Sequence, residues 1–445
     1  MIAQEKLNKR KHSTKKSVWQ TILEKTSFVE KNWLPLTLVI YLIRVVPLLQ
    51  HPTLWAEDAT VFYGPMIKTE IGFFQLAFTP YNGQFWLFDF LVAKLVILLT
   101  FENLSLLPLL STIVSLLFTL IFSSFWLRAD NILKHLWQRR IVFLFLLLAP
   151  SSYEPLGNVT NLHSYLLLGV VALAGWQIGP MKIKGVLFFS TIAVSIFTSI
   201  NGIFALFVFL AYLILNNKHS KIRIVIISIA IGFQINFWKS RTTSSIPESL
   251  IDQVSIFGSS VLKRIGAEAV VGQTGGSYLQ TRIENDFWII VGMPFLLLGT
   301  YLISTNWEGI KKSIPVQFIM LTLTLYFGMV LISAKALNLS ALTDFTFFGR
   351  YLMVVHCLIF VLFVQLASMA RSNRFSSAAI LMISIIMAMG VIADFRVANK
   401  STIETRVSWK NFASCMHEKR AVCDVVIPPG QNWGNWGIEF KSVDQ

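Results

Sequence analysis

Long apolar runs recur along the whole chain and are separated by short polar segments. Such runs, of about 15–24 residues, have the length of a helix that spans the hydrocarbon core of a bilayer, whereas the strands of a membrane barrel alternate polar and apolar residues. Eleven runs are unambiguous: residues 33–50, 105–127, 141–153, 163–178, 185–200, 202–216, 222–238, 287–304, 314–334, 350–370 and 376–395. The pattern predicts an all-α, polytopic membrane protein with about 11 transmembrane helices, and it excludes a soluble enzyme.

A further apolar run, residues 84–100, is ambiguous because it contains Asp89 and Lys94. The charges of the loops decide whether it crosses, because cytoplasmic loops collect Lys and Arg. If it does not cross, the basic loop 128–140 and the later Lys- and Arg-containing connections all fall on the cytoplasmic side. If it crosses, all of them fall outside. We therefore expect residues 84–100 to lie along the outer interface as an amphipathic helix.

This topology divides the chain into three parts. Residues 1–32 form a basic cytoplasmic tail, and residues 33–395 form the transmembrane domain. Residues 396–445 form an outer tail, periplasmic or extracellular. Large outer loops are expected at 51–104 and 239–286. The predicted location is the cytoplasmic (inner) membrane, with the N-terminus inside and the C-terminus outside.

Composition agrees with this class, and charge narrows the partners. Of 445 residues, 54% are hydrophobic and 14% are charged, whereas soluble domains carry about 25% charged residues. The net charge of +15 lies largely in short loops and the N-terminal tail, where it faces anionic lipid headgroups. It forms no basic stripe interleaved with aromatic residues, so the bilayer is the expected partner and nucleic acid is not.

Three cysteines are too few for a disulfide framework. Cys357 lies within an apolar run, whereas Cys415 and Cys423 lie in the tail that is predicted to be outside. An oxidising compartment makes these two residues candidates for a disulfide, although their spacing alone does not show that they pair.

Candidate chemistry begins directly after the first apolar run, where Glu57 and Asp58 are adjacent. Trp55, Phe62 and Tyr63 flank this pair. Partial desolvation among aromatic residues would raise the pKa of a carboxylate toward the range that suits a general base. The alternative is that both are solvated loop acids, which is the usual state of such a pair.

An acidic pair after the first span, then Phe73–Phe74, then Thr79-Pro80-Tyr81-Asn82-Gly83 before an interfacial helix, resembles the first outer loop of GT-C-fold glycosyltransferases. These membrane enzymes move a sugar from a polyprenyl-phosphate carrier to an acceptor. The resemblance is to members of the bacterial surface-glycan type. The resemblance implies that one acid of the pair is the catalytic base. The order here is Glu then Asp, whereas many relatives carry Asp first, so the choice between Glu57 and Asp58 stays open, with Asp58 preferred.

Two further segments resemble parts of the same family. Residues 153–163 carry Glu154, Asn158, Asn161 and His163, which with Tyr81 would bind the acceptor or the sugar. The alternative is that Asn158, Thr160 and Asn161 cap the helix that follows.

The segment Asp344–Tyr351 ends in an Arg-Tyr pair. The resemblance implies that Arg350 and Tyr351 lie beside the donor phosphate, with Lys335 as a second cation. An Arg stabilises a departing phosphate through bidentate hydrogen bonds. The alternative is an interfacial Arg that reaches toward lipid headgroups.

The resulting hypothesis is an inverting glycosyltransferase that acts on the outer face. Its partners would be a polyprenyl-phosphate sugar, a glycan or lipid-linked acceptor, and membrane proteins that supply the donor. No cofactor is expected; some members of the superfamily use a divalent metal, which only the acidic pair could suggest here. The alternative function is a transporter or flippase for lipid-linked or polar substrates, which would require charges inside the spans. A subunit without activity is a third class.

Overall fold

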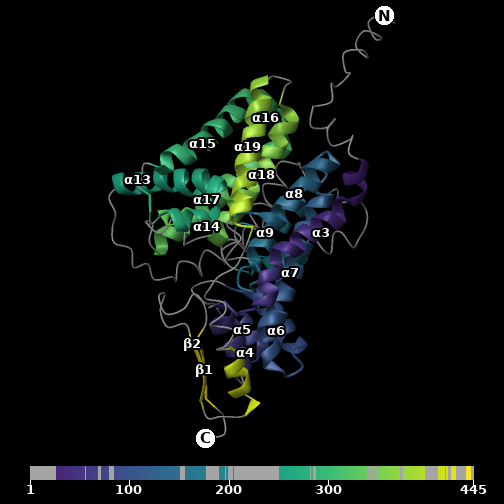
Figure 1. Ribbon diagram of the computed structural model, residues 1–445, viewed down its shortest axis with the longest axis vertical. Helices are drawn as coiled ribbons and strands as arrows, with labels where there is room; N and C mark the ends of the chain where they lie inside the picture. The colour runs from purple at the N-terminus through teal and green to yellow at the C-terminus, as the bar shows by residue number, and fades with distance from the viewer. Residues whose placement is uncertain are drawn as a thin grey trace, which may run out of the picture.

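The computed structural model shows a mostly helical protein with a small two-stranded ribbon near its C-terminus (Figure 1). The structure describes residues 27–55, 57–68, 72–79, 85–150, 156–176, 190–195, 197–198, 204, 250–280, 282–283, 287–337, 343–344, 349–370, 374–395, 409–415, 417–418, 422–426 and 437–441. Within these ranges, six helices are long and apolar enough to cross a membrane. The expectation of a helical membrane protein therefore holds.

The six candidate spans coincide with six of the eleven predicted runs. They are Asn32–Gln50, Leu104–Arg128, Phe287–Thr305, Ile314–Leu331, Tyr351–Met369 and Phe375–Ala393. They belong to helices α3 (Ser27–Gln50), α7 (Leu107–Ser124), α15 (Phe287–Thr305), α17 (Ile314–Leu337), α18 (Gly349–Met369) and α19 (Arg374–Ala393). Two more runs form the shorter helices α8 (Leu136–Leu148) and α9 (Leu162–Ala174). Half of the predicted run 185–200, nearly all of 202–216 and all of 222–238 lie outside the described residues.

Helices α3 and α7 run antiparallel. The Tyr41 hydroxyl donates a hydrogen bond to the carbonyl of Leu116 over 3.2 Å, and one residue, Gly157, packs against both Leu48 and Thr112. Later positions of α3 therefore meet earlier positions of α7. Residues 51–103 consequently leave and re-enter the bundle at the same end, where α4 (Gly64–Lys68), α5 (Phe73–Ala77) and α6 (Leu87–Leu99) lie (Figure 1).

Helix α6 is the ambiguous run of the sequence. It has 13 residues, as many as α8 and α9, so its length does not set it apart from these helices. Leu91, Leu95 and Leu98 point outward, while Asp89 and Ala93 are fully buried. The helix therefore presents leucines to the outside and its acid to the protein interior, which suits a helix that faces lipid.

The second half of the chain packs through close backbone approaches. Helix α13 (Leu250–Ser260), the π-helical turn η4 (Val261–Ala267) and α14 (Glu268–Gln280) lie across the ends of α15 and α19. Gly266 faces Gly292, and Gly390 faces Ala269, so closely that a Cβ atom at either helix position would meet backbone atoms at under 3 Å. Small residues here let η4 and α14 seat directly on the membrane helices. Helix α16 (Trp307–Lys312) connects α15 and α17.

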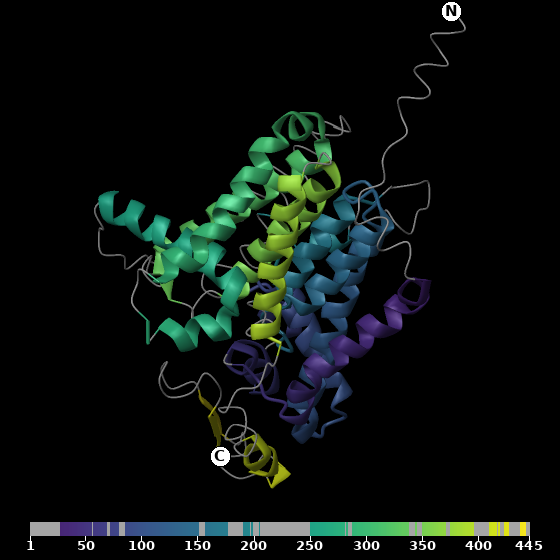
Figure 2. The same cartoon turned by 45° about the horizontal axis from the view of Figure 1, so that its top comes forward.

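The C-terminal tail departs from the all-α expectation. Strand β1 (Val422–Val426) pairs antiparallel with β2 (Gly437–Lys441), with Val422 opposite Lys441. Residues 409–415 are helical. In both ribbon views the tail lies beside α4, α5 and α6 (Figures 1 and 2). Hydrophobic periodicity identifies long spans well, but a short ribbon outside the bilayer leaves a weak signal of this kind.

Arg44 is a buried cation within the first span, and it holds α3 against α8. Its guanidinium donates to the carbonyls of Leu147 and Ala149 over 3.1 and 3.0 Å. These carbonyls belong to the C-terminal end of α8, which has no helical partners for them. The positive charge also interacts favourably with the negative end of the helix dipole.

We predict that Arg44→Met lowers the stability of the protein by about 2–5 kcal/mol, because two buried carbonyls lose their donor. Thermal unfolding in detergent measures the change. Arg128→Met is the matched control: Arg128 is exposed and lies over the ring face of Trp176, so its loss should cost under about 1 kcal/mol. Equal effects of the two substitutions would contradict the role given to Arg44.

Candidate functional site

The predicted acidic pair lies at the start of a short π-helical turn, η1 (Asp58–Tyr63), directly after the first span. Asp58 is completely buried, whereas Glu57 is half-buried. The Oδ1 atom of Asp58 accepts hydrogen bonds from the backbone N–H and the hydroxyl of Thr160, over 2.7 and 2.5 Å. Its Oδ2 accepts a longer bond of 3.4 Å from the backbone N–H of Trp55. The two adjacent acids therefore lie in different environments: Asp58 is buried and hydrogen-bonded, and Glu57 is half-buried.

Opposing effects set the protonation of Asp58. Burial dominates and raises the pKa to about 6, although the donors of Thr160 and Trp55 lower it; the neighbouring Glu57 raises it further. Thr160 precedes the first turn of α9, so the carboxylate also lies at a helix N-terminus, which favours an anion. Asp58 is therefore a carboxylate that can both hold and release a proton near neutral pH.

A second buried acid, Asp89, lies near Asp58 and was not predicted as a site residue. Asp89 is fully buried in the first turn of α6, and its Oδ1 lies 3.9 Å from His163 Nδ1. Within the described part of the chain, no other residue hydrogen-bonds to its carboxylate. Burial therefore raises the pKa of Asp89 well above its ordinary value, and the charge of Asp58 raises it further. We refer to Asp58, Asp89, Thr160 and His163 as the acidic site.

Aromatic side chains enclose the acidic site. The ring of Phe62 packs edge-on against Trp86 and Phe90, at centroid distances of 5.9 and 5.0 Å. Trp86 in turn packs against the ring of His163 at 5.3 Å. The buried Tyr63 donates its hydroxyl hydrogen to Ser111 Oγ over 2.9 Å. These rings exclude water, which is why burial governs the pKa of both acids.

The predicted acceptor residues have mixed outcomes. Asn158, Asn161 and His163 are buried in the segment that meets Asp58, so the structure brings this segment to the acidic pair. Asn161 is at the N-cap position of α9 but makes no capping hydrogen bond with its side chain. Thr160, which the sequence suggested only as a cap, binds Asp58 instead. Tyr81 and Glu154 lie outside the described residues.

For two of the three residues that are predicted to bind the sugar donor, the structure describes the backbone position only. Lys335 lies in the last turn of α17 and Arg350 in the first turn of α18, and neither side chain is among the described ones. Tyr351 is half-buried. Phe145 of α8 stacks on Phe360 of α18, and Gln138 reaches the carbonyl of Val364, so α18 runs antiparallel to α8. Arg350 therefore lies at the same end of the bundle as Asp58.

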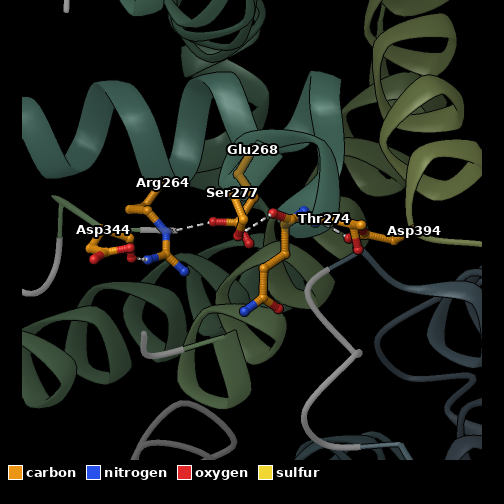
Figure 3. Close-up of polar contacts among 7 residues, drawn as sticks. Arg264, Glu268, Thr274, Ser277, Asp344 and Asp394 are labelled. Carbon is orange, nitrogen blue, oxygen red and sulfur yellow. Dashed lines mark hydrogen bonds and ion pairs between the residues drawn. The ribbon is translucent and has the colours of Figure 1, made fainter. Parts of the chain in front are cut away.

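A second polar cluster occupies the junction of η4 and α14 (Figure 3). Arg264 and Glu268 are both buried and form an ion pair of 2.6 Å. Arg264 also donates to the carbonyl of Asp344. The half-buried Lys263 has a pKa that burial lowers, an effect that the charge of Asp344 opposes. The cluster thus ties Asp344, which precedes α18 in the chain, to η4.

Asp394, directly after α19, binds backbone groups of α14 close to this cluster. Its two carboxylate oxygens accept hydrogen bonds from the backbone N–H groups of Gln273 and Thr274, each over 2.8 Å. These donors begin a new helical segment after Gly272, whose φ of 69° is accessible mainly to glycine. A Cβ atom at Gly272 would lie 2.7 Å from the Asp394 carboxyl group. The arrangement is a helix cap, and its signal in the sequence is an acid that ends the last apolar run.

Two further predictions concern metals and cysteines. Among the described residues, no group of three or more His, Cys, Asp or Glu side chains is arranged to hold a metal ion. Cys415 and Cys423 form a disulfide bond, and Cys357 is a buried free thiol.

We predict that Asp58→Asn makes the protein more stable at neutral pH. A carboxyl whose folded pKa is about 6 and whose ordinary pKa is 3.8 favours the folded state below pH 4, and this contribution is lost as the pH rises through 6. Asn resembles the protonated acid at every pH. The stability of the wild type should therefore fall relative to Asp58→Asn by about 2–3 kcal/mol between pH 4 and pH 7. Parallel melting-temperature curves across this window would contradict the prediction.

Comparison with known proteins does not identify the function of this site. No protein-family model, no curated protein and no solved structure matches the chain. The interpretation of the acidic site therefore depends on its own residues and geometry.

Proposed function

We propose that the protein is a glycosyltransferase of the GT-C type, which transfers a sugar from a polyprenyl-phosphate donor to a glycan or lipid-linked acceptor at the outer face of the membrane. The observation that carries the proposal is Asp58, a fully buried carboxylate after the first span, with a pKa of about 6 and fixed by Thr160. A general base works best when its pKa lies near the pH at which it operates.

In the proposed reaction, Asp58 removes the proton from an acceptor hydroxyl. The acceptor oxygen forms a bond to the anomeric carbon while the bond from that carbon to the lipid phosphate oxygen breaks, which inverts the configuration. The electron pair of the broken bond leaves on the phosphate, which is a stable anion, so no strong acid is required. Arg350, at the same end of the bundle, is the proposed cation for this phosphate, with Lys335 and Tyr351 beside it.

We further propose eleven spans, with the N-terminus in the cytoplasm and the acidic site outside. The disulfide between Cys415 and Cys423 supports this orientation, because such bonds persist in oxidising compartments. The basic connection between α7 and α8 supports it as well, since Gln365 near the end of α18 donates to the carbonyl of Ile132 in this connection. Basic residues thus gather at the end of the bundle opposite to Asp58, as cytoplasmic loops do.

The direct test compares cell-surface glycans, by mass, from cells that carry the wild type, Asp58→Asn or Glu57→Gln. Asp58→Asn keeps the shape and the acceptor oxygen but removes the base, so we expect loss of one sugar unit from the glycan with unchanged protein abundance. Glu57→Gln is the matched control, because Glu57 is adjacent but only half-buried. Full transfer by Asp58→Asn would disprove the proposed role.

The hydrogen bond from Thr160 provides a second prediction. Thr160→Val keeps the volume but removes a donor to the ionised carboxylate, which is worth about 1.5–3 kcal/mol. The pKa of Asp58 should therefore rise by about 1–2 units, and the acid limb of the pH–rate profile for sugar transfer should move to higher pH by the same amount. Thr160→Ser, which keeps the hydroxyl, should leave the profile near that of the wild type. A profile that Thr160→Val does not shift would separate Asp58 from the proton transfer.

A further inference from the structure

The C-terminal tail is docked on the elements that carry the acidic site. Trp409 is buried and donates its indole N–H over 3.0 Å to the carbonyl of Leu104, in the short 3₁₀ helix η2 (Leu104–Leu106) that precedes α7. Phe412 packs edge-tilted on Trp409 and is 1% exposed. Both side chains belong to the same hydrophobic core as Phe62 and Tyr63 of η1. We call residues 409–415, β1 and β2 together the C-terminal cap.

A covalent link joins the two parts of the C-terminal cap. Cys415 ends the described helical segment, and Cys423 lies on β1, so their disulfide ties the anchored helix to the ribbon. Strand β1 pairs along its whole length with β2. Strand β2 in turn lies against η1, the turn that begins at Asp58. A continuous connection therefore runs from Trp409 through the disulfide and the ribbon to η1, the turn whose first residue is Asp58.

The disulfide is placed where a reductant could act on it. Cys423 is buried against the core, but Cys415 is only half-buried. A small dithiol can attack by thiol–disulfide exchange: it supplies two electrons and two protons, becomes a disulfide itself, and leaves Cys415 and Cys423 as two thiols. The ribbon would then be held to the helical segment only by the intervening chain and its packing.

We propose that the C-terminal cap is a disulfide-locked cover of the acidic site, and that opening the disulfide gives water-soluble reagents access to Asp58. As a regulation of the same site, this inference rests on the function proposed above. Sugar transfer would require the C-terminal cap with its disulfide intact. The geometry itself does not depend on which reaction Asp58 performs.

The test measures access to Asp58 without any substrate. Purified protein is treated near pH 6, where Asp58 is partly protonated, with a water-soluble carbodiimide and an amine. Mass spectrometry then quantifies the modified peptide, with Asp58→Asn to assign the signal. The exposed Glu102 serves as the internal standard. Four samples are compared: wild type, wild type reduced with dithiothreitol, Cys415→Ser with Cys423→Ser, and Cys357→Ser.

We expect severalfold more modification of Asp58 in the reduced protein and in the double variant. Cys357→Ser removes a buried thiol that is not part of the disulfide, so it should behave as the wild type. Reoxidation of the reduced protein should restore protection, which distinguishes a reversible opening from unfolding. Unchanged modification after reduction, or Asp58 that stays reactive when the reduced protein is reoxidised before labelling, would overturn the proposal.

This outcome is separable from that of sugar transfer. If Asp58 is protected by the disulfide but its substitution leaves the glycan unchanged, the cover stands and the proposed reaction fails. If Asp58 is required for transfer but is modified equally with and without the disulfide, the reaction stands and the cover fails.

Discussion

The interaction on which the site depends is the pair of hydrogen bonds from Thr160 to Asp58. These residues are 102 positions apart, and they join the first loop to the start of α9. A buried carboxylate without donors would remain protonated, since nothing would offset its loss of hydration. With Thr160 and Trp55 as donors, Asp58 ionises near neutral pH although water is excluded. The fold thus creates a basic group in an apolar setting by bringing a helix N-terminus to it.

Asp89 shows what the same environment does in the absence of such donors. It is as buried as Asp58, but within the described part of the chain no donor hydrogen-bonds to its carboxylate, and His163 lies 3.9 Å away, beyond a direct hydrogen bond. The two carboxyls therefore differ in protonation because of their hydrogen-bond partners and not because of their depth. Environments that separate the pKa values of two neighbouring acids are typical of sites that handle protons. The stability that the folded state loses through these acids is the expected cost of such a site.

The sequence predicted what bilayer thickness and charge dictate. Span lengths follow from hydrocarbon thickness, and the basic loops indicate that residues 51–103 return to one end, where the antiparallel α3 and α7 place them. The sequence also singled out Asp58 as a candidate, because acids are rare in this chain and this one follows a span, and the structure shows this residue fully buried. Thr160 was not readable as its partner, since a contact across 102 residues has no local signal. In the sequence, Asp89 is a charged residue within an apolar run, and only the packed structure shows that its side chain is buried in the protein.

The tail illustrates a different limit, because its structure comes from the surface on which it docks. A five-residue strand such as β2 is not stable alone, and a two-stranded ribbon is marginal in water. Here Trp409 and Phe412 are buried in the core that contains η1, and the disulfide ties that anchor to β1. The ribbon therefore exists because the membrane domain and an oxidised cysteine pair hold it in place. Since η1 is one of the surfaces that the ribbon meets, the docked tail lies against the turn that begins at Asp58.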